Sequence, residues 1–310
     1  MIGWLILIAL LVVLALPLLR EIQRKPMSQS TRRDAPGQFV TLSQGTTHYR
    51  WIGPIRGPVA VCVHGLTTPS FVWDGLAAGL TAMGYRVLVY DLYGRGYSDR
   101  PKGAQDAGFF LTQLNDLLED QQVEDDITLL GYSMGGAIAT AFTAQQPGRI
   151  RQLVLLASAG LRPAPTGLIG FIARTPLIGD WLMFALYPSQ QRKGVEAERD
   201  LPSSVENISD LVLNELNHTG YVPAVLASLR GILAEPMDDR IRAIHSANVP
   251  VLAVWGRDDT VIPLTSMGRL AELNRTARQE VIEGAGHGLT YTHTRAVLDA
   301  MRETLRDGLI

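Results

Sequence analysis

The hydrophobic residues of this chain fall into one long run at the N-terminus and a series of short runs further along. The long run covers residues 1–19 and contains no charged side chain. The short runs are rich in Val, Ile and Leu and lie at 59–63, 87–90, 127–130, 152–157, 249–255 and 279–282. Short apolar runs of this kind are typical of strands buried on both faces, as in parallel sheets that helices cover. The pattern therefore predicts an α/β domain.

A helix over the N-terminal run would be about as long as the hydrocarbon core of a membrane is thick. At about 1.5 Å per residue, a helix over residues 1–19 spans about 28 Å, close to the roughly 30 Å of the hydrocarbon core. The alternative is a cleaved signal peptide, which would need a basic residue before a shorter apolar stretch and small residues at the cleavage site. No Lys or Arg precedes the run, and residues 16–20 offer no such site. We therefore expect an uncleaved transmembrane anchor over residues 1–19.

Basic residues follow the apolar run on its C-terminal side only: Arg20, Arg24, Lys25, Arg32 and Arg33. The positive-inside rule then predicts that this side of the membrane, with the rest of the chain, is cytoplasmic. Residues 26–37 are polar and rich in turn formers. We expect residues 20–38 to form a juxtamembrane linker to a globular domain over 39–310.

Composition narrows the classes of function. The 310 residues are 46% hydrophobic and 19% charged, which suits one large domain with an ample core. A net charge of −2 does not suggest nucleic acid as a partner. The single cysteine, Cys62, lies in a predicted strand and has no partner for a disulfide within the chain. No His-Glu-x-x-His motif, cysteine pair or dinucleotide-binding glycine pattern occurs, so we expect neither a metal nor a cofactor. No pattern along the chain specifies an oligomeric state.

The most informative motif follows the predicted strand 127–130. It reads Gly131-Tyr132-Ser133-Met134-Gly135-Gly136, and a run of good helix formers comes next. A serine between a strand and a helix, with glycine two residues away on each side, is the G-x-S-x-G nucleophile elbow. The glycines let strand and helix pass closely enough to hold the serine in a strained turn. The alternative interpretation is a glycine-rich loop with an ordinary surface serine.

An elbow serine needs a base, and an acid to orient that base. In this architecture the acid follows the serine along the chain and the histidine follows the acid. Asp258 and Asp259 come directly after the predicted strand 249–255, and His287 lies in a glycine-rich loop after 279–282. The carboxyl ends of the strands are where open α/β sheets bind ligands. The residues alone predict a triad of Ser133, His287 and either Asp258 or Asp259.

At this point the chain resembles the α/β-hydrolase family over most of residues 39–310. Gly256-Arg257-Asp258-Asp259 is similar to the family's G-x-x-D, which implies Asp259 as the acid and Asp258 as its neighbour. His64-Gly65-Leu66 resembles the family's His-Gly turn, which implies an oxyanion hole of the Leu66 and Met134 N–H groups and a local, non-catalytic role for His64. Residues 91–98 resemble the family's D-x-x-G-x-G-x-S turn. The resemblance further implies a helical cap inserted at about residues 161–236.

These features together lead us to expect a membrane-anchored serine hydrolase acting on carboxylic esters, with Ser133, Asp259 and His287 as its catalytic residues. The anchor and an apolar first part of the cap favour a lipophilic ester, as in monoacylglycerol lipases and carboxylesterases. One alternative keeps the triad but cleaves an amide, a thioester or a C–C bond. The other is a hydrolase-like binding protein without catalysis.

Overall fold

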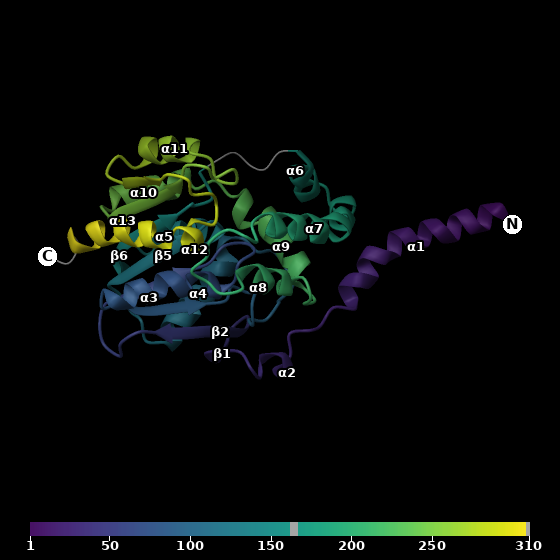
Figure 1. Ribbon diagram of the computed structural model, residues 1–310, viewed down its shortest axis with the longest axis horizontal. Coiled ribbons are helices and arrows are strands. Elements are labelled where there is room, and N and C mark those ends of the chain that lie inside the picture. The colour runs from purple at the N-terminus through teal and green to yellow at the C-terminus, as the bar shows by residue number, and fades with distance from the viewer. Residues whose placement is uncertain (162–166, 308–310) are drawn as a thin grey trace.

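The computed structural model describes residues 1–161 and 167–307. The centre of the domain is one eight-stranded sheet, and most of the other elements pack against it (Figure 1). The strand order is β1-β2-β4-β3-β5-β6-β7-β8. Strand β2 runs antiparallel to β1 and β4, and all the other neighbours are parallel. The strands are β1 Gln38–Leu42, β2 Gly45–Ile52, β3 Val59–Val63, β4 Arg86–Tyr90, β5 Ile127–Tyr132, β6 Ile150–Leu156, β7 Val251–Gly256 and β8 Arg278–Ile282. The predicted α/β architecture is confirmed.

Each short apolar run forms a strand, with ends that differ from the prediction by at most two residues. The sequence did not indicate the first two strands, because the hairpin β1–β2 mixes polar and apolar residues and lies at the sheet edge. Central strands such as β5 are buried along their whole length. Burial on both faces explains why only the interior strands appear in the sequence as continuous apolar runs.

Helices cover both faces of the sheet and create two apolar cores. Side chains of β3 alternate between them: Val61 and Val63 face one core, and Ala60 and Cys62 face the other. The first core includes α4 Ala107–Asp120, α5 Met134–Gln145, α10 Asp238–Ser246 and α11 Thr265–Leu273. The second includes α3 Asp74–Ala82 and α13 Thr294–Asp307, together with the short elements Ser70–Trp73 and α12 Leu289–Thr292. A further short turn, Pro147–Arg149, precedes β6.

A group of helices lies between β6 and α10, over the carboxyl ends of the strands. They are α6 Gly167–Arg174, α7 Ile178–Ala197, α8 Ile208–Glu215, α9 Tyr221–Arg230 and the short turn Ile232–Ala234. They share an apolar cluster of their own, which includes Ile172, Met183 and Val225. We call this group the cap. It falls within the predicted range 161–236, of which residues 162–166 lie outside the described residues.

The N-terminal helix α1, Ile2–Ile22, projects away from the sheet beside the cap (Figure 1). Among the described residues it is the one helix long and apolar enough to cross a membrane. The segment predicted as a linker, 20–38, contains the last turn of α1, a bridge between Lys25 and His218 of the cap, the short helix α2 Gln29–Arg32 and the start of β1. The first residues of this segment are therefore packed against the cap and do not form a free linker.

Candidate active site

Ser133 lies in the turn between β5 and α5 with an unusual backbone conformation. Its φ is 54° and its ψ is −118°, a combination that costs free energy for a residue with a side chain. Three hydrogen bonds hold it there. The Ser133 N–H donates to the Leu156 carbonyl at 3.0 Å, and the Ser133 carbonyl accepts from the N–H groups of Gly136 at 2.9 Å and Ala159 at 3.0 Å. Strand β6 and the segment after it thus fix the serine from the neighbouring side of the sheet.

The two glycines of the elbow are required by close approach of backbone. A Cβ at Gly131 would collide with the backbone of Gly135 and Gly136, and a Cβ at Gly135 would collide with the Val63 carbonyl. Helix α5 therefore starts directly against the ends of β5 and β3. This is the physical reason for the glycine spacing seen in the sequence.

Ser133, His287 and Asp259 form one hydrogen-bonded chain. His287 Nε2 lies 3.0 Å from Ser133 Oγ, and His287 Nδ1 lies 2.8 Å from Asp259 Oδ2. Because a carboxylate only accepts, Nδ1 carries the proton and leaves Nε2 free to accept from the serine hydroxyl. The other carboxylate oxygen, Oδ1, accepts from the N–H groups of Val261 at 2.7 Å and Ile262 at 2.8 Å. The arrangement allows a proton to pass from Ser133 to His287 while Asp259 keeps the imidazole oriented.

The structure distinguishes between the two adjacent aspartates. Asp259 is buried and reaches His287, whereas the Asp258 side chain is exposed to solvent. The Asp258 N–H donates to the Ala285 carbonyl at 2.9 Å, which ties the aspartate turn to the loop that carries His287. Asp258 therefore contributes through its backbone, and only Asp259 has a carboxylate facing the imidazole.

Two backbone N–H groups near Ser133 are candidates for an oxyanion hole. Neither the Leu66 nor the Met134 N–H donates a hydrogen bond within the part of the chain that the structure describes. Leu66 follows β3, and Met134 is the first residue of α5, where the helix leaves its N–H groups unpaired. These are the two groups that the sequence analysis expected.

His64 takes no part in the triad. It is fully buried, and its Nδ1 donates to the Gly65 carbonyl at 2.8 Å while its Nε2 accepts from the Leu92 N–H at 2.8 Å. Burial lowers the pKa of His64 to about 4, so the ring is neutral at physiological pH. His64 thus connects the turn before Leu66 to the end of β4.

Arg95 is a residue of the site that sequence reasoning missed. Its guanidinium is fully buried; Nε donates to the Leu66 carbonyl at 3.1 Å, and Nη2 donates to the Ala224 carbonyl at 3.2 Å and to Ser228 Oγ at 2.9 Å. Burial lowers its pKa to about 10, which leaves it charged. Arg95 therefore joins the loop of the candidate oxyanion hole to α9 of the cap. In the sequence an arginine between two glycines of a turn resembles an exposed residue.

A cavity of about 750 Å³ opens above Ser133. Cap residues Ile169, Tyr187, Leu229 and Leu233 form much of its wall, and His287 lies at its base. Among its described lining residues there is no Lys, Arg, Asp or Glu. A second cavity of about 370 Å³ meets it at Tyr132, Tyr187 and His287 and extends toward polar cap residues such as Gln190, Gln191 and Glu198. No group of residues suited to a metal ion occurs in the ranges described.

Comparison with known proteins shows the family of the chain. A family model described as the alpha/beta hydrolase fold matches residues 58–294, and the chain belongs to this family. It is 25% identical to Lipase 1 of Psychrobacter immobilis over 291 residues, covering 88% of each chain. It is 27% identical to a 2-hydroxy-6-oxononadienedioate/2-hydroxy-6-oxononatrienedioate hydrolase of Cupriavidus pinatubonensis, over 86% of this chain and 94% of the relative. A solved structure described as a membrane phospholipase A, a bacterial virulence factor, superposes with a TM-score of 0.71 at 20% identity, covering 99% of this chain and 97% of that one.

We predict that Gly135→Ala destabilises the protein. Its Cβ would meet the Val63 carbonyl, and overpacking of this kind costs about 1–3 kcal/mol. Thermal unfolding should show a Tm several degrees lower. Gly268→Ala in α11 is the matched control, because nothing lies within 4 Å of a Cβ there and alanine favours a helix. An unchanged Tm for Gly135→Ala would contradict the close approach.

We predict that Asp259→Asn lowers kcat by about 10³–10⁴-fold, because an amide in this position favours the wrong imidazole tautomer. Asp258→Asn is the matched control and should leave kcat close to that of the unchanged protein, since its side chain is exposed. Hydrolysis of a p-nitrophenyl ester measures both. The opposite ranking of the two variants would assign the acid to Asp258.

Proposed function

We propose that this protein is a serine hydrolase that cleaves carboxylic esters with a lipophilic acyl group. The observation that carries the proposal is the Ser133–His287–Asp259 chain at the base of an apolar cavity. The hydroxyl, the imidazole and the carboxylate are already within hydrogen-bonding distance. The unpaired N–H groups belong to Met134, which follows Ser133, and to Leu66, which lines the same cavity as Ser133. Acyl transfer to a serine needs these parts in this arrangement.

In the proposed reaction Ser133 Oγ attacks the ester carbonyl carbon while His287 Nε2 takes the hydroxyl proton. The Leu66 and Met134 N–H groups stabilise the negative charge that develops on the carbonyl oxygen. His287 then gives the proton to the leaving alcohol, and the acyl group remains on Ser133. Water repeats the sequence with the acyl-enzyme and releases the acid. Asp259 stays ionised and stabilises the imidazolium in both halves.

The cavity supports an uncharged, lipophilic acyl group. Its wall offers aliphatic and aromatic side chains from the cap, and its described lining has no cation to pair with a second carboxylate of a substrate. This argues against a diacid such as the one named for the Cupriavidus relative. The more polar second cavity suits a leaving alcohol with free hydroxyls, as in a monoacylglycerol. Amides, thioesters and C–C bonds are the alternative substrates for the same triad.

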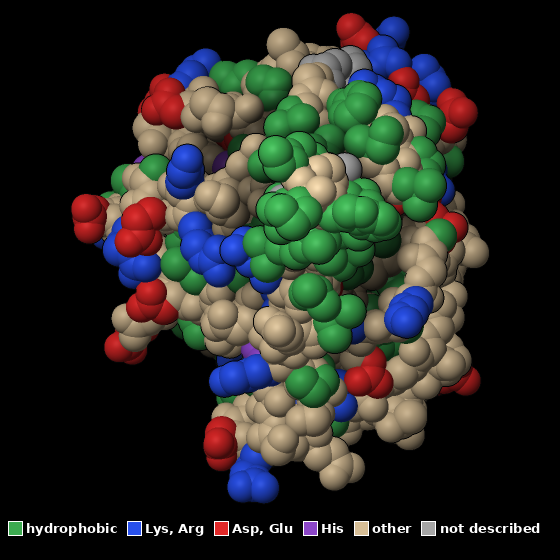
Figure 2. All heavy atoms as spheres, turned by 90° about the vertical axis from the view of Figure 1, so that its right-hand side faces the viewer, with side chains coloured by type: hydrophobic (Ala, Val, Ile, Leu, Met, Phe, Trp, Pro, Cys, Tyr) green, Lys and Arg blue, Asp and Glu red, His purple; other side chains and the backbone are tan. Residues whose placement is uncertain are grey.

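We further propose that α1 is a transmembrane anchor and that the catalytic domain lies on the cytoplasmic side. Figure 2 shows hydrophobic side chains gathered on the face of the molecule from which α1 projects. Exposed apolar residues belong to α1 and also to the cap, including Leu168, Phe171, Leu177 and Ile178. An apolar surface of this kind favours contact with lipid. The likeness to the membrane phospholipase structure extends over 99% of this chain and so includes most of α1.

We predict that Ser133→Ala abolishes ester hydrolysis by about 10⁴-fold or more, since the members of a triad act as a unit. It should also abolish labelling by a fluorophosphonate probe. Ser158→Ala, which changes another buried serine close to the elbow, is the matched control and should still be labelled. Persistent labelling of Ser133→Ala would disprove the nucleophile.

The unchanged enzyme should cleave a p-nitrophenyl ester and a monoacylglycerol faster than an anilide or a thioester of the same acyl chain. Faster cleavage of the anilide would disprove the ester preference.

We predict that the full-length protein stays in the membrane after carbonate washing and that its mature mass includes residues 1–19. A form that begins at residue 20 should be released, because it lacks the apolar run but keeps the contacts of residues 21–25 with the cap. Protease added outside intact cells should leave the domain uncut. A mature N-terminus near residues 20–30 would show a cleaved signal peptide instead of an anchor.

A further inference from the structure

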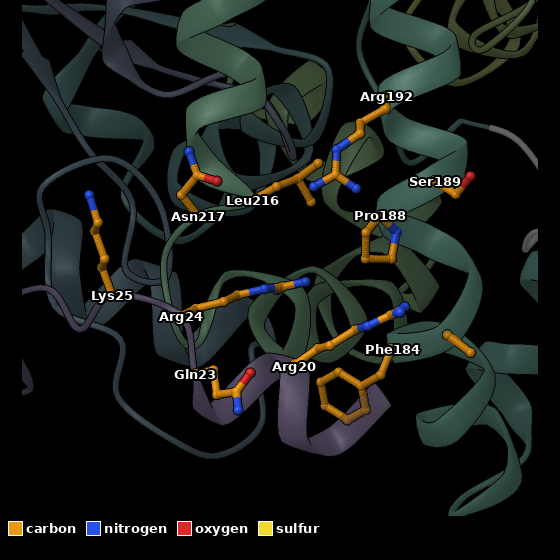
Figure 3. A pocket seen from close by; sticks show the side chains of 11 residues that line it. Arg20, Gln23, Arg24, Lys25, Phe184, Pro188, Ser189, Arg192, Leu216 and Asn217 are labelled. Carbon is orange, nitrogen blue, oxygen red and sulfur yellow. The ribbon is translucent and has the colours of Figure 1, made fainter. Parts of the chain in front are cut away.

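A third cavity of the molecule lies where α1 meets the cap, outside the candidate active site. It has a volume of about 640 Å³ and is formed by the last turn of α1, the middle of α7 and the residues after α8 (Figure 3). Helix α7 separates it from the cavity above Ser133: Tyr187 lines the catalytic cavity, and the next residue, Pro188, lines this one. We call it the basic cavity, because its charged lining residues are Arg20, Arg24, Lys25 and Arg192.

The positive charge of the basic cavity exceeds what the surrounding chain neutralises. Arg24 pairs with Glu21 at 2.5 Å. The side chains of Arg20, Lys25 and Arg192 have no hydrogen bond or ion pair in the described ranges. Burial lowers the pKa of Arg24, Glu21 opposes that effect, and the positive charge of Arg192 adds to it. Figure 3 shows the guanidinium groups of Arg24 and Arg192 directed into the same space. An anion placed there would relieve this repulsion.

The walls of the basic cavity are fixed by hydrogen bonds to the backbone. Lys25 N–H donates to the Asn217 carbonyl at 2.9 Å, and Thr219 N–H donates to the Lys25 carbonyl at 2.9 Å. Glu21, which is buried, accepts from the Gly220 N–H at 2.7 Å. Thr219 Oγ1 also donates to the Arg24 carbonyl at 2.7 Å. These bonds fix the backbone that carries Arg24 and Lys25 against residues 217–220, so this wall needs no rearrangement to receive a ligand.

The position along α1 indicates where such an anion comes from. Arg20 is the first charged residue after the apolar run, so the cavity lies at the level at which a membrane's phosphates meet the end of the span. Beside the cations the lining contains Phe184, Pro188 and Leu216. Arginine forks match the geometry of phosphate oxygens, and the apolar residues suit the glycerol and the first carbons of an acyl chain.

We propose that the basic cavity binds the phosphate of an anionic phospholipid, with Arg24 and Arg192 as its principal donors. The site rests on α1 lying in the membrane and is independent of the ester chemistry at Ser133. It also differs from the general charge bias of cytoplasmic loops, which requires cations near the membrane but no particular position for them. That difference can be tested, because α7 carries two neighbouring cations of which only Arg192 lines the cavity.

The experiment titrates the full-length protein in a neutral detergent with phosphatidylglycerol or phosphatidylcholine and counts the retained lipid by native mass spectrometry. Phosphatidylglycerol should be retained preferentially. Arg192→Glu should weaken its binding about tenfold or more, the effect of losing a charge-assisted hydrogen bond. Lys193→Glu is the matched control: it makes the same charge change one position along α7, at an exposed residue outside the cavity, and should leave binding nearly unchanged.

A second variant and a soluble competitor complete the test. Arg192→Gln removes the charge without inverting it and should also weaken binding, which guards against misfolding of the glutamate variant. Equal retention of the two lipids by the unchanged protein, or equal losses for Arg192→Glu and Lys193→Glu, would overturn the site. Displacement of the lipid by glycerol 3-phosphate at matching concentration would overturn the lipid as the source and assign the cavity to a soluble phosphate. A failure of Ser133→Ala to lose activity would leave these results unaffected.

Discussion

The backbone of Ser133 is held in a conformation that a residue with a side chain rarely adopts, and much of the domain is arranged to hold it there. Helix α5 must begin within contact of β3 and β5, which only glycine at positions 131 and 135 permits. Strand β6 must lie beside β5 to accept the Ser133 N–H. The central parallel strands therefore do more than form a core. They fix a hydroxyl at the point where the loops after β3, β7 and β8 converge.

Buried charged side chains join the sheet and its loops to the cap. Arg95 connects the Leu66 loop to α9, and Glu215 at the end of α8 accepts from the Gly96 N–H at 3.0 Å. Burial raises the pKa of Glu215 to about 7, although Arg100 at 3.7 Å acts in the opposite direction. Buried polar groups of this kind add little net stability, since desolvation offsets their attraction. Their geometry instead sets one position for the cap, and the cap in turn supplies the wall of the cavity above Ser133.

The sequence predicted those parts of the molecule that depend on local chemistry. Interior strands appear as apolar runs because both faces are buried, and the elbow appears because its glycines are required by contact within a few residues. The choice between Asp258 and Asp259 came from resemblance to a family motif, since residue type alone does not distinguish neighbours. Arg95 and Glu21 were not identified. Each has a partner in the cap more than a hundred residues away, and no periodicity in the sequence indicates a contact of that kind.

The contact between Glu21 and the cap ties the proposed anchor to the proposed chemistry. The carboxylate at the end of α1 accepts from the N–H of Gly220, which begins α9. Helix α9 accepts hydrogen bonds from Arg95, which also donates to the Leu66 carbonyl, and it places Leu229 in the wall of the catalytic cavity. Trp181 of α7 makes a parallel link, since its Nε1 donates to the Leu14 carbonyl within the apolar run, at 3.0 Å. If α1 lies in the bilayer, as proposed, this second contact places the start of α7 at the depth of Leu14, inside the apolar run, and brings the apolar surface of the cap to the lipid. These two hydrogen bonds fix the cap, and with it the wall of the catalytic cavity, relative to α1.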